Sequence, residues 1–394
     1  MMQPSEIASG SILVVSPDFP YPANTGGRVD IGGRLRILKQ LGYDVDLIST
    51  TNSPPEEYIK QARRYVTNLW FCKRQRVLWN FVSLVPFQIL TRRGLTDFPL
   101  LDKTYDFILL ESQRVFCILL NPTLKANTVL LRVHNDEPKY YVGLARSSSS
   151  LIEKFFFYAE ALKFHTFDKR IFLMTDGFMF VSKDEFEQKR LNLGRPCIFL
   201  PPTLSKDKFA EPTLPSKTVL FLGSLFVQNN REAVQWYLKW VHPRITDPAY
   251  RLIIAGNSRG QRINWLLRLI SDYQNIVLYD APSELDEIYR QAAVFVNPTR
   301  HGAGISTKTI EAICNGLPVV STIIGVQGTC LVHKEHVLIA DDFVQFANYV
   351  SFLLQNNEHR ISLVKQAQQF LGKHYNHEQK LRELLQGFLS VNTE

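Results

Sequence analysis

Short apolar runs alternate with helix-like periodic stretches along most of the chain. In the first half, strand patterns occupy residues 11–16, 44–50, 105–112, 127–135, 177–182 and 197–202. Amphipathic helical patterns occupy residues 28–41 and 147–170. A strand, a Pro- and Gly-rich loop, a helix and a second strand at the start predict a βαβ unit. Its strands should be parallel and its crossover right-handed.

The same alternation restarts after a polar, proline-containing segment at residues 203–216, which predicts a linker between two domains. Strands are expected at 218–224, 250–258, 275–280, 293–299, 317–322 and 336–342, and helices at 231–241, 262–271, 283–292 and 306–316. The predicted organisation is a domain at 1–202, a linker at 203–216, a second domain at 217–375 and a helical tail at 376–394. Such α/β sheets bind ligands at the carboxyl ends of their strands, so we expect a cleft between the two domains.

Charge and cysteine usage narrow the class of partner. Lys and Arg number 45 against 37 Asp and Glu, a formal net charge of +8. Besides an ordinary solvated surface, this excess suits a nucleotide, an anionic lipid or a nucleic acid. No nucleic-acid-binding signature is present, so nucleic acid is not expected as a partner. The five cysteines form no C-x-x-C or Cys/His cluster, which favours reduced thiols in a cytoplasmic protein over zinc or a disulfide framework.

One aromatic stretch, residues 77–90, raises the question of membrane contact. It is shorter than the roughly 20 apolar residues that span a bilayer. Basic residues flank it: Lys73, Arg74, Arg76, Arg92 and Arg93. It reads either as an amphipathic segment in the headgroup region of an anionic membrane or as a buried hydrophobic element. The N-terminus lacks a signal-peptide pattern, so the expected localisation is cytoplasmic, with possible peripheral contact at the inner face of the membrane.

The stretch at residues 294–322 carries the clearest chemistry. A buried strand ends at Asn297, a loop containing Gly302 and Gly304 follows, and a helix is expected to begin near Ser306. The glycines allow left-handed backbone and close approach to a ligand. The N–H groups and dipole of the helix start favour an anion. Ser306 is the expected N-cap, and Gly316 is expected just beyond the helix end.

Two charged residues of this helix are candidates for ligand binding. Lys308 is a cation in the first turn, where it opposes the helix dipole unless an anion lies beside it. Glu311 lies one turn further on, where its carboxylate could accept both hydroxyls of a ribose. The alternative is a solvated surface on which Glu311 is paired with Lys308.

These motifs together resemble a known family. The run G-A-G-I-S-T-K-T-I-E-A-I-C-N-G-L-P-V-V at residues 302–320 is similar to the donor-binding signature of the retaining glycosyltransferase family four. The resemblance covers nearly the whole chain: P-x-P-x-x-x-G-G at 20–27, R-V-H-N-D-E at 132–137, F-L-G-S-L-F-V-Q-N-N at 221–230 and I-I-A-G-N at 253–257. It implies a GT-B fold, in which two Rossmann-like parallel-sheet domains face each other across a cleft. The first domain would bind the acceptor and the second the nucleotide-sugar.

The resemblance also implies roles for individual residues. Lys308 would hold the donor phosphates, Glu311 the ribose, and His134 would lie near the reacting centre, beside donor sugar and acceptor. Gly26 and Gly27 would approach the donor phosphate and sugar from the first domain. The remaining donor-binding positions are expected at Gly223, Ser224, Gly256, Tyr279, Asp280, Arg300, Gly302, Ala303, Gly304, Ile305, Ser306 and Thr307. For His134 the alternative is a structural donor at the end of a strand.

Two departures from the family pattern concern the donor. Ala303 stands where the family has the first of two glutamates, so the identity of the sugar stays open. The loop after the first strand of the second domain lacks the usual Arg and Lys and offers Ser224, Gln228 and Asn229 instead. Lys308, with Arg300, is expected to supply the missing positive charge.

The implied reaction is hexosyl transfer from a UDP-sugar or GDP-sugar to a saccharide or lipid-linked acceptor in polysaccharide biosynthesis. The configuration at the anomeric carbon would be retained. The nucleotide-sugar would be a co-substrate, and no cofactor is expected. A metal ion is not expected either. The alternatives are a nucleotide-sugar epimerase, a phosphorylase, or a catalytically weak homologue that binds a nucleotide or another protein.

Overall fold

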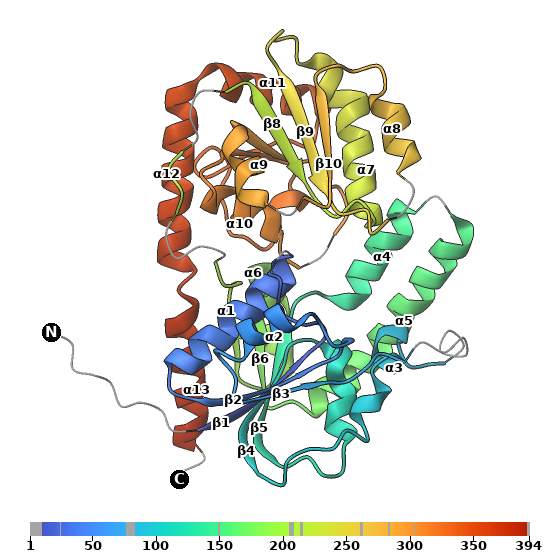
Figure 1. The fold of residues 1–394 in the computed structure, drawn as a ribbon, viewed down its shortest axis with the longest axis vertical. Coiled ribbons are helices and arrows are strands. Elements are labelled where there is room, and N and C mark those ends of the chain that lie inside the picture. The colour runs from blue at the N-terminus through green and yellow to red at the C-terminus, as the bar shows by residue number, and fades with distance from the viewer. Residues whose placement is uncertain are drawn as a thin grey trace, which may run out of the picture. The chain divides into compact units, whose positions relative to one another are not determined.

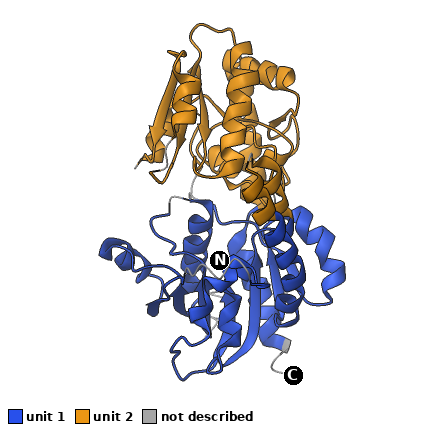
Figure 2. Ribbon diagram, turned by 90° about the vertical axis from the view of Figure 1, so that its right-hand side faces the viewer, with its two compact units in different colours: residues 1–138, 158–205, 375–394 blue, residues 139–157, 206–374 orange. Residues whose placement is uncertain are grey.

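A computed structural model describes residues 10–23, 25–75, 83–148, 150–204, 209–212, 216–260, 263–282, 284–302 and 304–391. The chain forms two compact units, which Figure 2 distinguishes by colour. Unit 1 contains residues 1–138, 158–205 and 375–394, and unit 2 contains residues 139–157 and 206–374. Residues 139–157, which lie within the range predicted as the first domain, thus group with unit 2. The last twenty residues group with unit 1.

Unit 1 is built on a parallel sheet of seven strands in the order β3-β2-β1-β4-β5-β6-β7 (Figure 1). The strands are β1 (Ser11–Ser16), β2 (Asp44–Ser49), β3 (Asn68–Phe71), β4 (Tyr105–Leu110), β5 (Ala126–Val133), β6 (Gly177–Phe180) and β7 (Cys197–Phe199). The helices are α1 (Gly26–Gln40), α2 (Glu56–Ala62), α3 (Phe87–Leu90), α6 (Lys183–Leu193) and α13 (His377–Val391). Two further helices, α4 (Glu137–Ser147) and α5 (Leu151–Leu173), begin in one unit and end in the other. Short 3₁₀ helices lie at Arg93–Leu95 and Gln113–Leu120.

Unit 2 repeats the architecture with six parallel strands in the order β10-β9-β8-β11-β12-β13. The strands are β8 (Thr218–Leu222), β9 (Arg251–Gly256), β10 (Ile276–Asp280), β11 (Val294–Asn297), β12 (Val319–Ser321) and β13 (Leu338–Ile339). The helices are α7 (Gln228–Trp236), α8 (Asn264–Ile270), α9 (Leu285–Gln291), α10 (Thr307–Cys314), α11 (Phe343–Gln355) and α12 (Asn357–His374). A π-helical turn at Tyr237–Val241 continues α7, and 3₁₀ turns lie at His242–Arg244 and Ile324–Val326.

The predicted fold class, two Rossmann-like parallel-sheet domains, is confirmed. The strands of each sheet carry apolar residues on both faces, because helices cover both sides of a parallel sheet. In β1, Ile12, Leu13, Val14 and Val15 are all at most 1% exposed. In unit 2, Val294, Phe295 and Val296 of β11 are fully buried in the same way. Because these runs have no alternating polar positions, they were readable as buried strands from the sequence alone.

The helical stretch expected at residues 147–170 was wrong in its boundaries. It consists of the end of α4 and most of α5, separated at residues 148–150. The Oγ of Ser150 accepts from the N–H of Glu153 at 3.4 Å, and the Oγ of Ser148 donates to the Glu153 carboxylate at 2.6 Å. Serine side chains compete with helix hydrogen bonds and favour helix starts. The serine run therefore stops one helix and begins the next.

The expected linker, residues 203–216, lies partly outside the described residues. Of its described part, Thr203 belongs to unit 1, where its N–H donates to Asp30 at 2.8 Å. Ala210 lies against unit 2, where its N–H donates to the carbonyl of Cys314 at 2.9 Å. Each end of the segment is thus anchored to its own unit.

The basic flanks expected around residues 77–90 differ in their environment. Arg92 is only 2% exposed, and its guanidinium donates to the Oγ1 of Thr50 at 2.9 Å and to the carbonyl of Pro17 at 3.1 Å. It therefore stabilises unit 1 and cannot contribute a surface charge. Arg93 is exposed, whereas Arg76 and residues 77–82 lie outside the described part of the chain. No helix among the described residues is long and apolar enough to cross a bilayer.

Candidate active site

The buried side-chain amide of Asn297 fixes the loop between β11 and α10. Asn297, the last residue of β11, is fully buried. Its Nδ2 lies 2.8 Å from the Oγ of Ser306 and 2.8 Å from the carbonyl oxygen of Gly325. Its Oδ1 accepts from the Oγ1 of Thr299 at 2.7 Å. A side chain with both donors and an acceptor in use at the end of a strand fixes the start and the end of the loop together.

Of the two loop glycines, Gly304 has the left-handed backbone that was expected, whereas Gly302 does not. Gly304 has φ +77° and Gly316, just after α10, has φ +78°, both in the left-handed region that favours glycine. Gly302 lies against α4: a Cβ on Gly143 would be 3.5 Å from the Gly302 nitrogen. Ala303 lies outside the described residues.

Ser306 occupies the N-cap position of α10, but its side chain makes no capping hydrogen bond. The physical reason is that its Oγ accepts from Asn297 instead. The first N–H groups of α10 are therefore not satisfied by the N-cap side chain, which leaves them suited to an anion. Ile305 and Thr307, on either side, are half-buried.

Lys308 points from the first turn of α10 towards two neutral oxygens. Its Nζ donates to the Oδ1 of Asn230 at 3.0 Å and to the Oγ1 of Thr299 at 2.9 Å. It also lies 5.3 Å from the ring centroid of Phe221. Burial lowers the pKa of Lys308 to about 7. Within the described ranges no carboxylate is paired with this ammonium, so a bound anion would supply its missing counter-charge.

Glu311 follows one turn later on the same helix. Burial raises its pKa to about 7. No hydrogen-bond or ion-pair partner of its carboxylate is found among the residues that the structure describes. The alternative in which Glu311 is simply a surface partner of Lys308 is thus not what the structure has.

The expected donor positions at the ends of β8 and β9 are explained by backbone packing. A Cβ on Gly256 would lie 1.9 Å from the carbonyl oxygen of Gly223, so the fold itself requires glycine there. A Cβ on Gly223 would lie 3.0 Å from the Asn230 side chain, whose Nδ2 donates to the carbonyl of Ser224 at 3.1 Å. Asn230 thus connects this turn to Lys308.

The other expected positions in unit 2 have partners within the protein. Asp280, at the end of β10, accepts from the N–H and Oγ of Ser258 at 2.8 and 2.7 Å, while its neighbour Tyr279 is half-buried. Arg300 forms an ion pair with Glu232 at 3.2 Å. We expected the positive charge of Arg300 to contact the donor phosphates. Because Glu232 lies beside Arg300, that charge is partly neutralised.

In unit 1, Gly26 and Gly27 are the first residues of α1, with Thr25 as N-cap. Gly27 is exposed, and a Cβ added to it would meet no atom within 4 Å. The protein's own packing therefore does not require glycine at this position. A ligand that approaches the helix start closely would require it.

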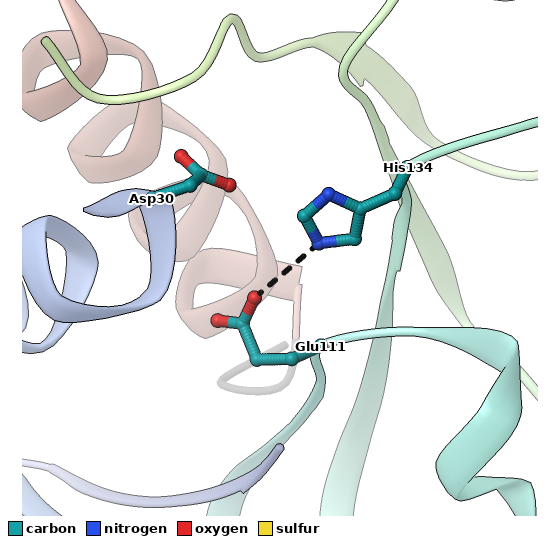
Figure 3. Close-up of side chains that lie close together, drawn as sticks. All are labelled: Asp30, Glu111 and His134. Carbon is teal, nitrogen blue, oxygen red and sulfur yellow. Dashed lines mark ion pairs between the residues drawn. The ribbon is translucent and has the colours of Figure 1, made fainter. Parts of the chain in front are cut away.

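His134 directly follows β5, and Figure 3 shows it together with Asp30 and Glu111. Its side chain is 24% exposed, and its Nε2 lies 3.8 Å from the Oε2 of Glu111. One ligand atom from each of the three residues falls within 4.8 Å of the others, a spacing that a metal ion would also accept. The partners of the two carboxylates decide how the cluster should be interpreted.

Both carboxylates are already paired with buried arginines. The Nε of Arg34 donates to Glu111 at 2.7 Å and its Nη2 to Asp30 at 2.9 Å, while Arg132 donates to Asp30 at 3.0 Å. Burial opposes ionisation of Glu111, but the charge of Arg34 outweighs it and holds the pKa of Glu111 at about 2. Two cations balance two anions, so the cluster forms a neutral buried network that orients His134.

The C-terminal helix completes this network. The Nδ1 of His377, the first residue of α13, lies 2.8 Å from the carbonyl oxygen of Pro201, and its Nε2 lies 3.4 Å from Arg34. Because a carbonyl can only accept, Nδ1 carries the hydrogen and Nε2 faces the guanidinium as an acceptor. Burial, with Arg34 and Arg132 nearby, lowers the pKa of His377 to about 3.

Several of these residues were missed in the sequence. Asp30 and Arg34 are an i, i+4 pair on the buried side of α1, and charges on an apolar helix face are the signal that could have found them. Glu111 directly follows the buried run of β4, as His134 follows β5, and the carboxyl ends of parallel strands are where such folds place functional side chains. Asn297 and Asn230 stood inside the quoted motifs without an assigned role.

Comparisons with known proteins agree with this architecture. A family model described as "Glycosyl transferases group 1" matches residues 216–356. The chain is 36% identical over 375 residues to an uncharacterized 44.6 kDa protein in the cps region of Klebsiella pneumoniae, covering 92% of this chain and 96% of that protein. Residues 216–356 thus form a group 1 glycosyl transferase domain, and the chain is a GT-B glycosyl transferase. Enzymes of this group transfer sugars from nucleotide-sugar donors, so the nucleotide-sugar is the co-substrate of this glycosyl transferase.

Solved structures with the same fold cover almost the whole of this glycosyl transferase. TarM matches with a TM-score of 0.71 at 10% identity, covering 96% of this chain and 98% of that chain. An S. aureus TarM variant in complex with fondaparinux, α-GlcNAc-glycerol and UDP matches with a TM-score of 0.72 at 9% identity, covering 96% and 99%. Anabaena HepE in complex with UDP and glucose matches with a TM-score of 0.63 at 11% identity, covering 96% and 100%. At these identities the likeness shows the GT-B fold.

Proposed function

We propose that this glycosyl transferase moves a hexosyl group from a UDP-sugar or GDP-sugar to a saccharide or lipid-linked acceptor, with retention at the anomeric carbon. The observation that carries the proposal is Lys308, a half-buried cation in the first turn of α10 that is held by two neutral oxygens. A lysine there opposes the helix dipole and is desolvated as well. A bound pyrophosphate offsets both the unfavourable dipole and the desolvation. Its negative charge attracts the lysine and the positive end of the helix dipole.

In the proposed reaction, negative charge develops beside Lys308 and the first N–H groups of α10. As the glycosidic bond to the donor phosphate breaks, negative charge grows on the nucleoside diphosphate leaving group. Lys308 and the uncapped N–H groups of α10 are preorganised for that charge, and donors of this kind commonly provide the largest single rate contribution. Glu311, one turn on, accepts the ribose hydroxyls. In this proposal Lys308 and Glu311 bind the donor, and His134 acts at the sugar.

We assign the remaining roles by the two domains predicted from the sequence. The range 1–202 binds the acceptor and contributes Gly26, Gly27 and His134, while 217–375 binds the nucleotide-sugar. Gly302, Gly304, Ile305, Ser306 and Thr307 form the phosphate loop, and the turn after Tyr279 lies near the base. Because Lys308 offers the counter-charge, we propose turnover without a metal ion. Complete loss of activity in excess EDTA that Mg²⁺ restores would contradict this.

The cps-region relative supports a role in polysaccharide biosynthesis. We propose that this enzyme works in the cytoplasm at the inner face of the membrane, where a lipid-linked acceptor would be presented. UDP is present in the complexes of TarM and HepE, which supports UDP as the first nucleotide to test.

Calorimetric titration of UDP, GDP and ADP into the wild type and Lys308→Ala tests the donor site. We expect one nucleotide to bind the wild type and to bind Lys308→Ala at least about tenfold more weakly, since a charge-assisted hydrogen bond contributes on the order of 2 kcal/mol. Lys365→Ala, on the exposed side of α12, is the matched control and should bind like the wild type. If none of the nucleotides binds the wild type, the proposed function is wrong.

The stereochemical part needs its own measurement. Once a donor and an acceptor support turnover, nuclear magnetic resonance of the first-formed product reports its anomeric configuration. Retention is expected, and a product of inverted configuration would contradict the mechanism while leaving the donor site intact.

A further inference from the structure

Helix α5 presents a stripe of large apolar side chains to solvent. Leu151, Phe155, Tyr158 and Leu162 are 81%, 78%, 49% and 69% exposed. They are spaced i, i+4, i+7 and i+11, which places them on one face of a helix with 3.6 residues per turn. Ile152, beside the stripe, is 83% exposed. We call these five side chains the α5 stripe.

In the second half of α5, side chains away from the stripe contribute to the core. Ala161, Phe164 and Ile171 are at most 7% exposed. The helix is therefore apolar on two sides, of which one packs against the protein and the other is exposed in the part of the chain that the structure describes. A contiguous apolar surface that the chain leaves uncovered marks an interaction site more often than scattered single residues do.

The charges of α5 are sorted between the same two faces. Its acids Glu160 and Asp168 are buried, at 0% and 6% exposure, and Glu160 accepts from Lys163 and from the N–H of Phe87, both at 2.8 Å. Lys169 and Arg170, which follow the stripe, are exposed. Glu153 is the exposed acid of the helix, and its carboxylate accepts from the Oγ of Ser148. The outward side of α5 is thus apolar and basic.

The buried face of α5 is tied to α3 by a hydrogen bond. The bond from the N–H of Phe87 to Glu160 ties the start of α3 to α5, and Figure 1 draws the two helices side by side. Three residues before Phe87, Leu84 is 89% exposed. Because Glu160 lies on the buried face of α5, this bond places the start of α3 on the face opposite the stripe.

We propose that the α5 stripe docks this enzyme on an anionic lipid bilayer, with α5 lying in the plane of the headgroups. Apolar side chains would enter the acyl boundary, while Lys169 and Arg170 would contact lipid phosphates, as in interfacial amphipathic helices. A second copy of the chain is a poorer occupant, since pairing two such faces would bring like charges together. The inference rests on the proposed membrane acceptor and names the surface that would reach it.

Vesicle sedimentation tests the stripe directly. The wild type, the double variant Phe155→Glu/Leu162→Glu and the control Leu191→Glu are each mixed with phosphatidylcholine vesicles, with and without phosphatidylglycerol. Leu191, on α6, is 79% exposed and lies outside the stripe, which makes it a matched control. We expect the wild type and Leu191→Glu to sediment with the anionic vesicles. The bound fraction of the double variant should fall by at least about tenfold, since two apolar side chains that would enter the acyl boundary are replaced by charged ones.

Three further readings complete the test. Lys169→Glu/Arg170→Glu should bind anionic and neutral vesicles equally weakly. UDP or GDP binding by the Phe155→Glu/Leu162→Glu protein should equal that of the wild type, so a failure of the donor site and a failure of the stripe are separate results. The inference is overturned if the wild type does not sediment with anionic vesicles at low salt. It is also overturned if the double variant binds these vesicles as the wild type does. A wild-type dimer that becomes a monomer in the double variant would overturn it as well.

Discussion

Lys308 and Glu311 lie three residues apart on α10, and in the part of the chain that the structure describes they form no ion pair. A lysine and a glutamate at this spacing on an exposed helix would ordinarily attract each other. Here the lysine donates to Asn230 and Thr299 instead, while burial moves the pKa of both groups to about 7. The two ionisable groups of the proposed donor site are therefore poised to change protonation when a ligand arrives.

The first prediction is that nucleotide binding changes its proton balance with pH. At pH 8 the free Lys308 is mostly neutral, and a bound pyrophosphate raises its pKa, so binding takes up a proton. At pH 6 the free Glu311 is mostly protonated, and ribose hydroxyls that donate to the carboxylate lower its pKa, so binding releases a proton. Calorimetry in buffers of different ionisation enthalpy measures both, and affinity should be highest near pH 7.

Two conservative variants assign the protons. Lys308→Arg keeps a charge that does not titrate, so uptake at pH 8 should vanish while binding persists. Glu311→Gln should abolish the release at pH 6. An unchanged proton balance in both variants would mean that neither group contacts the ligand.

The second prediction separates the needs of folding from those of donor binding at Gly27. A Cβ here meets no protein atom within 4 Å, and alanine is the better helix former, so Gly27→Ala should be as stable as the wild type or more stable by about 0.5 kcal/mol. The same methyl would stand where the donor phosphate approaches. Turnover should fall by at least about tenfold, through the transition-state contact it displaces.

Gly387→Ala is the matched control for Gly27→Ala. Gly387 lies in α13, and an added Cβ there also meets nothing within 4 Å. Its melting temperature should likewise be equal to or slightly above that of the wild type, while kcat/KM stays at the wild-type level. If Gly27→Ala also keeps the wild-type kcat/KM, Gly27 does not lie at the donor.

The fold was predictable because its strands are uninterrupted apolar runs. Residues 11–16 and 294–297 needed no alignment to be read as buried strands, and their order gave two parallel sheets. Strand β3 and helices α2 and α6 were missed, because Asn68–Phe71 is only half-buried and the two helices are mostly polar. The pattern of hydrophobic and polar residues in a sequence reflects burial. Elements that are little buried are therefore hard to recognise from that pattern.

The site was predictable only where one motif carries it. Gly304 and Lys308 stand in a single run of sequence, and loop geometry alone implied an anion. The network behind His134 joins Asp30, Glu111 and His377, residues up to 347 positions apart in the chain. No spacing rule connects such residues, because tertiary packing brings them together. Their buried charges become interpretable only when their partners are seen.

The third prediction distinguishes Glu111 from His134, although their side chains are 3.8 Å apart. Glu111→Gln leaves two buried arginines with one carboxylate, so it should destabilise unit 1 by about 3 kcal/mol. His134→Ala removes a partly exposed ring and should cost much less stability, but kcat should fall by about 100-fold. Urea midpoints and steady-state kinetics measure the two effects. Equal losses of stability in both variants would mean that His134 has only a structural role.

The fourth prediction concerns the pH dependence of stability through His377. Its pKa lies at about 3 in the folded protein, against the ordinary 6.5, because burial and the facing Arg34 and Arg132 outweigh the attraction of Asp30. Between these values the unfolded chain binds a proton that the folded chain does not. Stability therefore falls as pH drops below 6.5, by about 1.4 kcal/mol per pH unit for this one group.

His377→Gln removes the titration while an amide can still donate to Pro201 and accept from Arg34. The urea midpoint of this variant should change less between pH 6.5 and pH 4.5 than that of the wild type. His359→Gln, at an exposed position of α12, should keep the wild-type slope. Parallel curves for wild type and His377→Gln would show that the ring is already protonated when folded. In that case Nε2 could not be the acceptor that faces Arg34, and the C-terminal helix would be held to unit 1 by other contacts.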